Sequence, residues 1–235
     1  MASTNTLSLI AENNIVVNGS ITNNQTGNIV MQAGFDGISY GLGGITLNAP
    51  VSTGGEVHLI AGGDITQQAS GSITAAGLKA VSDSGAVNLA NLSATNAVNK
   101  IAGSAKGQFA FRNNGALEIG TVGGVSGITA NGFGSGAHVT VNVDVIGGPL
   151  TVANNVTATG GDGSEGQAGG NAVIALTSNG GIAVNSGATV QAMGGSGGFG
   201  WGTDDGAGGM ASVALNNTGA ASNLQINSGA TVRAD

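Results

Sequence analysis

The sequence contains no cysteine and only two prolines, Pro50 and Pro149. The absence of cysteine excludes disulfide bonds as a source of stability. Glycine is abundant, with 46 residues among 235, but it follows no strict triplet period. A collagen triple helix requires glycine at every third position together with much more proline, and it is therefore excluded.

Large and charged side chains are also scarce. Aromatic residues make up 3% of the chain and charged residues 7%, whereas hydrophobic residues reach 40% and are mostly Val, Ile, Leu and Ala. A compact globule needs bulky side chains in its interior, whereas a narrow tube needs only small branched side chains at repeated positions. The composition therefore favours a tube. Disorder is the alternative, but disordered chains are poor in β-branched residues, which recur here in short runs.

The charge distribution argues against two classes of partner. The formal net charge is -7, and the five basic residues are scattered along the chain. Nothing in this pattern could neutralise a nucleic-acid backbone or hold an anionic bilayer. No apolar run approaches the ~18 to 20 residues of a membrane span, and the first residues do not resemble a signal peptide. We therefore expect that a leader has been removed or that the sequence is a segment of a larger protein.

An internal repeat indicates the fold. Residues 185–192 (NSGATVQA) and 227–234 (NSGATVRA) differ at one position. Elsewhere apolar residues occur in pairs two positions apart, which is the alternation of a strand with one buried face. We assign one strand family to the pairs Leu7/Leu9, Ile29/Met31, Val57/Leu59, Val87/Leu89, Phe109/Phe111, Val139/Val141, Ile174/Leu176 and Val213/Leu215.

Two further strand families complete each repeat. The second contains Ile15/Val17, Ile45/Leu47, Ile65/Gln67, Leu117/Ile119, Leu150/Val152, Ile182/Val184 and Leu224/Ile226. The third contains Ile21, Val51, Ile73, Ile128, Val156, Val190 and Val232, and it places an outward row at Thr22, Ser52, Thr74, Thr129 and Thr157. Three short strands per repeat, separated by turn residues, predict an all-β parallel β-solenoid (β-helix) of about eight three-sided coils. We expect one domain over residues 1–235, with a distorted coil near residues 90–108.

A strand motif adds a family resemblance. The pattern G-x-I/V-x-L/M-x-A occurs at residues 27–33, 43–49 and 55–61. It resembles the repeat region of filamentous haemagglutinin-like exoproteins, the secreted adhesins of two-partner secretion systems. The resemblance implies a right-handed β-helix exported to the bacterial cell surface, and a host-cell or matrix surface, including its glycans, as partner. The sequence has no NPN-type tetrapeptide of the family's secretion domain, so we interpret the chain as a segment of the shaft.

Long glycine-rich loops are predicted at one corner of the coils, at residues 132–137, 160–170 and 194–209. Phe199, Trp201, Asp204 and Asp205 concentrate in the last loop, where they could stack on a sugar or hold calcium. The alternative is that Trp201 folds back and caps the loops. Asp162 and Glu165 lie in GGDGSEGQA, which is similar to a calcium-binding nonapeptide and makes them candidate calcium ligands. No other cofactor is expected.

Catalytic chemistry finds little support. The carboxylates are mostly isolated at turns, where Asp and Glu serve the turn itself. His58 and His138 are expected to point outward, several coils apart, so they cannot share a metal or a catalytic triad. We therefore interpret the chain as a non-catalytic structural or adhesive shaft. A self-assembling filament subunit, stacking through its open ends, is the alternative, and a polysaccharide-active enzyme is a more distant one.

Overall fold

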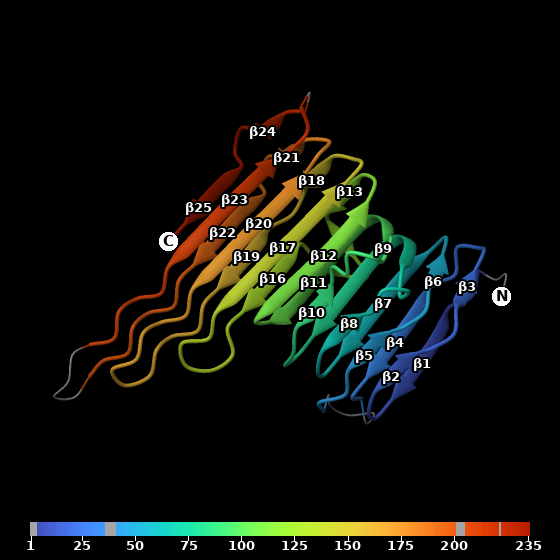
Figure 1. Ribbon diagram of the computed structural model, residues 1–235, viewed down its shortest axis with the longest axis horizontal. Coiled ribbons are helices and arrows are strands. Elements are labelled where there is room, and N and C mark those ends of the chain that lie inside the picture. The colour runs from blue at the N-terminus through green and yellow to red at the C-terminus, as the bar shows by residue number, and fades with distance from the viewer. Residues whose placement is uncertain (1–3, 36–40, 201–204, 221) are drawn as a thin grey trace.

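The computed structural model describes residues 4–35, 41–200, 205–220 and 222–235. Within these ranges every regular element is a β-strand. The strands form two large parallel sheets and one short hairpin, and in both sheets strand order follows the chain from the blue end to the red end (Figure 1). This arrangement is compatible with the predicted β-solenoid.

One of the sheets, called here the second sheet, has eight strands and runs the whole length of the stack. Its register is parallel at each step; Phe109, for example, pairs with Val141 and Val141 with Ile174. The strands in order are β2 (Ile15–Val17), β5 (Ile45–Leu47), β8 (Ile65–Gln67), β10 (Val87–Leu89), β12 (Gln108–Asn114), β17 (Val139–Ile146), β20 (Ala172–Ser178) and β23 (Ala211–Asn217).

The larger sheet changes its shape halfway along the stack. In the amino-terminal half, two columns of strands merge into the long strands β9 (Ile73–Ser82) and β11 (Ala97–Lys106). These columns are β1 (Leu7–Ala11), β4 (Ile29–Ala33) and β7 (Glu56–Ala61), and β3 (Ile21–Asn23) and β6 (Val51–Thr53). Beyond β11 the sheet divides again, because β11 pairs with both β13 and β16. The bends of the coil therefore fall at different positions of the repeat in the two halves of the stack.

Two new columns continue from β11 to the carboxy-terminal end. One contains β13 (Leu117–Ile119), β18 (Leu150–Val152), β21 (Ile182–Val184) and β24 (Leu224–Ile226). The other contains β16 (Ile128–Asn131), β19 (Val156–Thr159), β22 (Thr189–Met193) and β25 (Thr231–Ala234). Between β13 and β16 the chain leaves the sheet as the hairpin β14 (Thr121–Val122) and β15 (Val125–Ser126).

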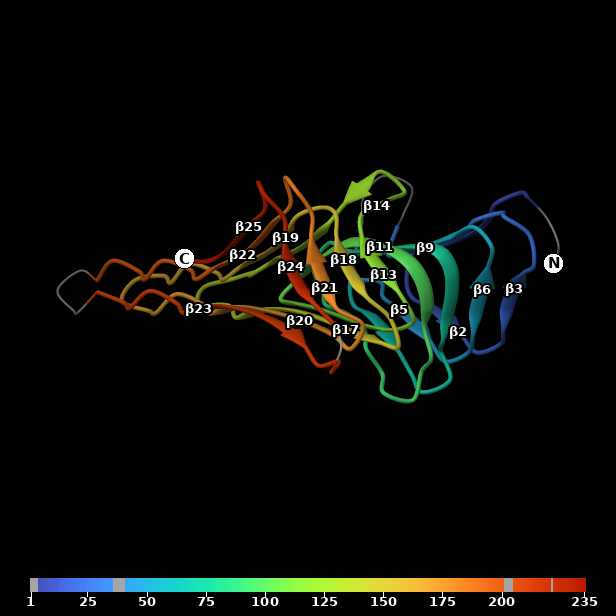
Figure 2. The same cartoon turned by 90° about the horizontal axis from the view of Figure 1, so that it is seen from above.

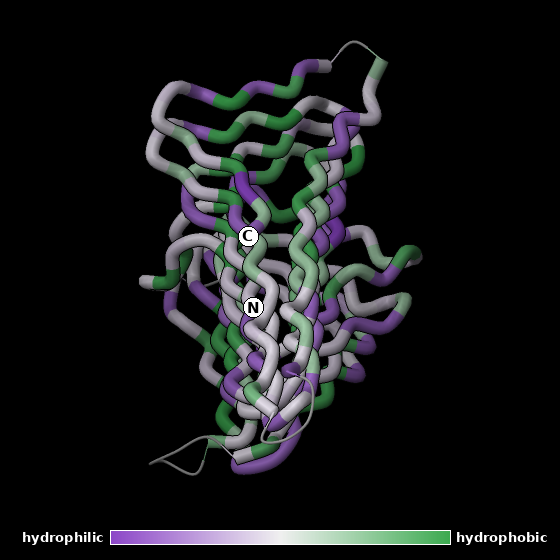
Figure 3. Tube along the Cα trace, turned by 90° about the vertical axis from the view of Figure 1, so that its left-hand side faces the viewer, coloured by the Kyte–Doolittle hydropathy of each residue, from purple (hydrophilic) through white to green (hydrophobic). Residues whose placement is uncertain are grey.

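The core is a single cluster of small apolar side chains enclosed by the sheets. Alternate residues of most strands, such as β7 and β17, point inward, and Figure 3 shows the resulting alternation of hydrophobic and hydrophilic residues along the traces. Phe109 and Phe111 are the largest side chains that are fully buried. Each buried Val, Ile or Leu contributes about 1.5 to 3 kcal/mol relative to exposure. A single coil cannot bury its own apolar face, so this contribution depends on the neighbouring coils.

The predicted strand families are wrong at one step. Val57 of β7 pairs with Leu78 of β9, whereas Val87 of β10 pairs with Ile65 of β8. The first and second families therefore exchange sides of the tube between residues 73 and 106. The short strands of both sheets, such as β5, β8, β13 and β18, have the same two-residue alternation, so alternation alone cannot assign a strand to a side.

Two further expectations concern the middle of the chain. Within the predicted distorted coil at residues 90–108, residues 97–106 form the ten-residue strand β11, in which three consecutive residues, 101–103, are buried and the two-residue alternation is broken. In that strand Ile101 is fully buried and pairs with Leu78. The predicted threonine row is interrupted: Thr74 pairs with Ala97, and Thr129 belongs to another column, where it pairs with Ser104.

Candidate binding surfaces on the wing and beside Arg112

The three glycine-rich loops lie side by side and project from one end of the strands. We call residues 132–137, 160–170, 194–200 and 205–209 the wing. Figure 1 shows the loops lengthening toward the carboxy-terminal end, and Figure 2 shows that they form two layers, one of outgoing and one of returning segments. The loops are expected at one corner of consecutive coils, and their described residues lie next to the amino-terminal ends of β17, β20 and β23.

Backbone hydrogen bonds join the loops of the wing to one another. Gly161 donates to Ala137 O at 2.9 Å, and Gly163 donates to Ser196 O at 2.7 Å. Gly195 in turn donates to Gly170 O at 2.9 Å. The segments contain Gly-Gly-X steps and bond mainly to neighbouring segments.

Close contact explains why this packing needs glycine. A Cβ atom on Gly195 would lie 2.1 Å from the carbonyl oxygen of Gly161, and one on Gly170 would lie 1.9 Å from that of Ala137. Neither glycine has a positive φ, so the requirement is for space rather than for a left-handed backbone. The wing is therefore an ordered extension of the sheets.

The predicted ligand residues of the last loop are partly placed. Phe199 is 69% exposed. Asp205 Oδ1 accepts a hydrogen bond from the Gly200 N–H at 2.9 Å, which joins the outgoing and returning segments of this loop. Trp201 and Asp204 lie outside the described residues. Ligand binding by these four residues stays a prediction.

The candidate calcium ligands lie in the second loop of the wing. Asp162 Oδ1 accepts a hydrogen bond from the Ser196 N–H at 2.8 Å, which joins the second loop to the third. Glu165 is exposed at the turn where Gln167 N–H donates to Ser164 O. In the part of the chain that the structure describes, no three acidic or histidine residues gather to hold a metal ion. Calcium binding stays a prediction.

The two histidines are expected to point outward and several coils apart; His58 lies on β7, with a side chain 15% exposed, and His138 lies just before β17. His58 Nε2 lies 2.7 Å from Glu56 Oε2 on the outer face of β7. His138 Nδ1 accepts a hydrogen bond from the Asn171 N–H at 2.8 Å, just before β17. The His58 ring thus contacts a side chain of its own strand, and the His138 ring binds the backbone of the segment before β20.

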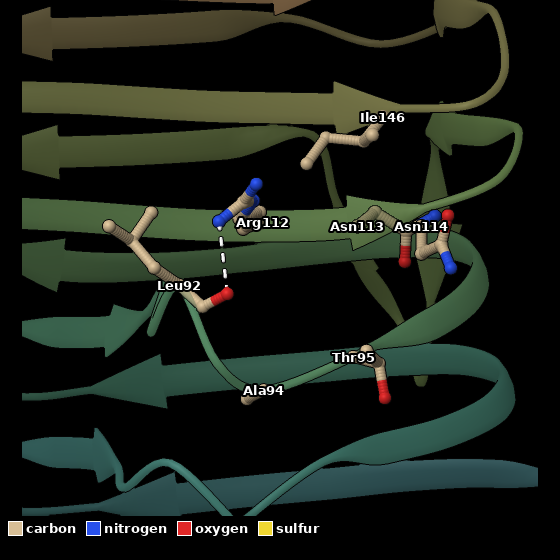
Figure 4. A pocket seen from close by; sticks show the side chains of 7 residues that line it. All are labelled: Leu92, Ala94, Thr95, Arg112, Asn113, Asn114 and Ile146. Atoms are coloured by element: carbon tan, nitrogen blue, oxygen red, sulfur yellow. Dashed lines mark hydrogen bonds between the residues drawn. The ribbon is translucent and has the colours of Figure 1, made fainter.

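A pocket that the sequence did not predict lies beside Arg112 (Figure 4). Its volume is about 180 Å³, and its lining residues are Leu92, Ala94, Thr95, Arg112, Asn113, Asn114 and Ile146. Arg112 Nη1 donates to Leu92 O at 3.2 Å, and Arg112 Nε lies 3.4 Å from Asp144 Oδ2. The pocket thus combines a paired guanidinium with apolar side chains.

The wall of this pocket is the loop of residues 90–96, and buried Asn96 fixes its end. Asn96 Oδ1 accepts from the Gln67 side chain at 2.6 Å and from the Ile73 N–H at 2.9 Å. Its Nδ2 donates to Leu89 O at 3.1 Å and to Arg112 O at 2.9 Å. These bonds tie the loop to three successive coils.

Comparisons with known proteins give no further guide to the activity. None of the described residues forms a helix that is long and apolar enough to cross a membrane. No family model, no curated protein and no solved structure matches this chain.

Proposed function

We propose that the chain is a non-catalytic structural or adhesive shaft segment of a secreted bacterial surface protein. We further propose that it is a right-handed parallel β-solenoid of about eight coils. The eight strands of the second sheet support this coil number. Connections between parallel strands of one sheet are right-handed in nearly all proteins, which supports the handedness.

The observation that carries this proposal is the combination of a continuous core with a lateral wing. Each coil is held by ladders to the coils before and after it, so the stack resists separation along its whole length. The wing extends these ladders sideways through backbone bonds. Such a body suits the display of surface loops at a distance.

The repeated strand motif supports the resemblance to secreted adhesins. Its apolar positions in residues 27–33 and 55–61 are Ile29, Met31, Val57 and Leu59, and all are fully buried. The motif therefore corresponds to the ladder residues that any coil of this kind requires. Adhesion to a host-cell or matrix surface is the role that such a shaft would serve.

Adhesion can be tested with the purified chain coupled to fluorescent beads. We expect saturable binding to epithelial cells or to matrix-coated surfaces, and competition by the soluble chain. Beads coated with the heat-denatured chain are the matched control. If the native chain binds no better than that control, the adhesive role is contradicted, and only the structural role of the shaft remains as the proposal.

A second candidate function is end-to-end assembly. Leu224 and Ile226 of β24 are 47% and 51% exposed, and among the described strands β24 pairs with β21 alone. Exposed strand edges favour pairing with another chain. Negative-stain electron microscopy over a concentration series, with and without calcium, tests this: filaments that lengthen with concentration favour assembly, and isolated particles oppose it.

A further inference from the structure

We propose that the pocket beside Arg112 binds one pyranose ring at the end of a neutral glycan. The inference rests on the adhesive function proposed above and gives it a ligand class and a site. The pocket lies at the carboxy-terminal ends of β10 and β12, whereas the wing adjoins the amino-terminal ends of β17, β20 and β23. The two surfaces can therefore be altered separately.

The pocket is preformed. Asn96 is 1% exposed and holds the end of the 90–96 loop, and its own carbonyl accepts a hydrogen bond from the Asn114 N–H at 2.7 Å. At the start of the loop, Asn91 accepts from the Ser93 N–H at 3.0 Å. A ligand that enters does not have to order this loop, which lowers the entropy lost on binding.

The apolar wall includes a leucine that is exposed and does not belong to the core. Leu92 is 80% exposed, and it lies across the pocket from Ile146. Figure 4 shows the guanidinium of Arg112 between these two side chains. A pyranose ring has one face of C–H groups and a rim of hydroxyl groups. Leu92 and Ile146 offer the apolar contact that the C–H face needs.

The polar wall can serve the hydroxyl groups. The side chains of Thr95 and Asn114 have no hydrogen-bond partner among the described residues, and each can both donate and accept. Arg112 uses Nη1 for Leu92 O, which leaves further N–H donors. A sugar hydroxyl also both donates and accepts, so it matches this set.

The charges favour a neutral ligand. Arg112 is already paired with Asp144, so an acidic ligand would meet a carboxylate as well as the guanidinium. A peptide strand would need a free sheet edge, but β10 pairs with β8 on one side and with β12 on the other. The volume of about 180 Å³ suits one ring, with the rest of the glycan in solvent.

The test is a titration of the ¹⁵N-labelled full chain with methyl pyranosides of glucose, galactose and mannose, followed by NMR. Methyl glucuronide, which carries a carboxylate, is the acidic comparison. We expect at least one neutral pyranoside to give saturable shifts at residues 92–95, 112–114 and 146. Saturable shifts from none of them, or from the acidic sugar with higher affinity, would overturn the proposal.

Variants assign the binding to the pocket. Arg112→Lys keeps the charge but loses the planar donors, and Leu92→Ser removes a wall that is already exposed, so both should fold. Each should weaken binding about tenfold. Arg233→Lys, which alters an exposed arginine paired with Asp235, should leave the Kd unchanged. Equal affinity of Arg112→Lys and the parent chain would contradict the site.

Cell adhesion separates this inference from the function on which it rests. Beads coated with Arg112→Lys should bind epithelial cells less than beads coated with the parent chain. If the parent chain adheres and Arg112→Lys adheres equally, the pocket proposal fails and the adhesive role stands. If the parent chain does not adhere but binds a pyranoside at residues 92–95, the adhesive role fails alone.

Discussion

The side-chain amide of Asn113 takes the place of a neighbouring strand for Val98. Asn113 Oδ1 accepts a hydrogen bond from the Val98 N–H at 2.9 Å, and its Nδ2 donates to the Val98 carbonyl at 3.0 Å. The column of β3, β6 and the first residues of β9 ends here, because the next coil passes from β12 directly to β13, which pairs with Lys100 and Ile101. One side chain thus completes the end of a strand column.

Replacing Asn113 should destabilise the whole stack. Asn113→Ala leaves the N–H and the carbonyl of buried Val98 without partners, and we expect a loss of about 2 to 4 kcal/mol in the free energy of unfolding. Urea unfolding followed by circular dichroism measures this. Asn142→Ala, on the exposed face of β17, is the control and should change the free energy by less than about 0.5 kcal/mol. Equal effects of the two variants would contradict the role of Asn113.

The alternation within strands could be predicted from the sequence because it is local. Val141 and Ile174 each have an apolar neighbour two positions away, and the structure buries these residues in register. The wing could also be predicted, since glycine-rich insertions recur at one position of the repeat. Local patterns therefore establish most strands and one corner.

The assignment of strands to sides could not be predicted, because it depends on where the chain bends. β9 and β11 pass from one column to the other within one continuous strand. The glycine at this point of β9, Gly77, lies inside the strand and does not end it. The pocket was missed for a related reason. Leu92 and Arg112 belong to successive coils, and only the register of β10 with β12 brings their segments together.

The central phenylalanines should dominate the stability of the middle coils. Phe109 is fully buried, and Phe109→Ala removes apolar contacts and leaves a cavity, so we expect a loss of about 3 to 5 kcal/mol. Gln108→Ala changes the adjacent exposed side chain and is the control. Thermal unfolding by calorimetry compares the two variants. A Phe109→Ala transition at the temperature of the parent chain would show that this side chain is not part of the core.

The hairpin β14–β15 should stabilise the chain by packing on the outer face of the larger sheet. Val122 is buried, and a Cβ atom on Gly77 would lie 3.0 Å from Val122 Cγ1, while Lys79 Nζ donates to Gly123 O at 3.2 Å. Val122→Ser should destabilise the chain by about 1 to 3 kcal/mol through lost apolar burial. Val125→Ser, on the less buried strand of the hairpin, should have a smaller effect in the same urea titration. A larger loss of stability in Val125→Ser than in Val122→Ser would contradict the packing of Val122 on the sheet.

The wing offers two glycines that should respond differently to the same change. Gly195→Ala would place a Cβ atom 2.1 Å from Gly161 O, whereas the nearest atom to a Cβ on Gly208 is Gly195 O at 3.9 Å. Neither glycine has a positive φ, so the two variants differ mainly in available space. Overpacking of this kind destabilises by about 1 to 3 kcal/mol. Gly195→Ala should therefore open the wing, and Gly208→Ala should not.

Hydrogen exchange followed by mass spectrometry distinguishes these outcomes. In Gly195→Ala we expect amides of residues 160–170 and 194–200 to exchange at least about fivefold faster than in the parent chain, as a local loss of 1 kcal/mol or more requires. Strands β12 and β17 should keep their protection, because the wing lies outside the core. Faster exchange throughout the sheets would mean that the wing is part of one cooperative unit with the solenoid, and unchanged exchange would mean that the loops do not depend on glycine contacts.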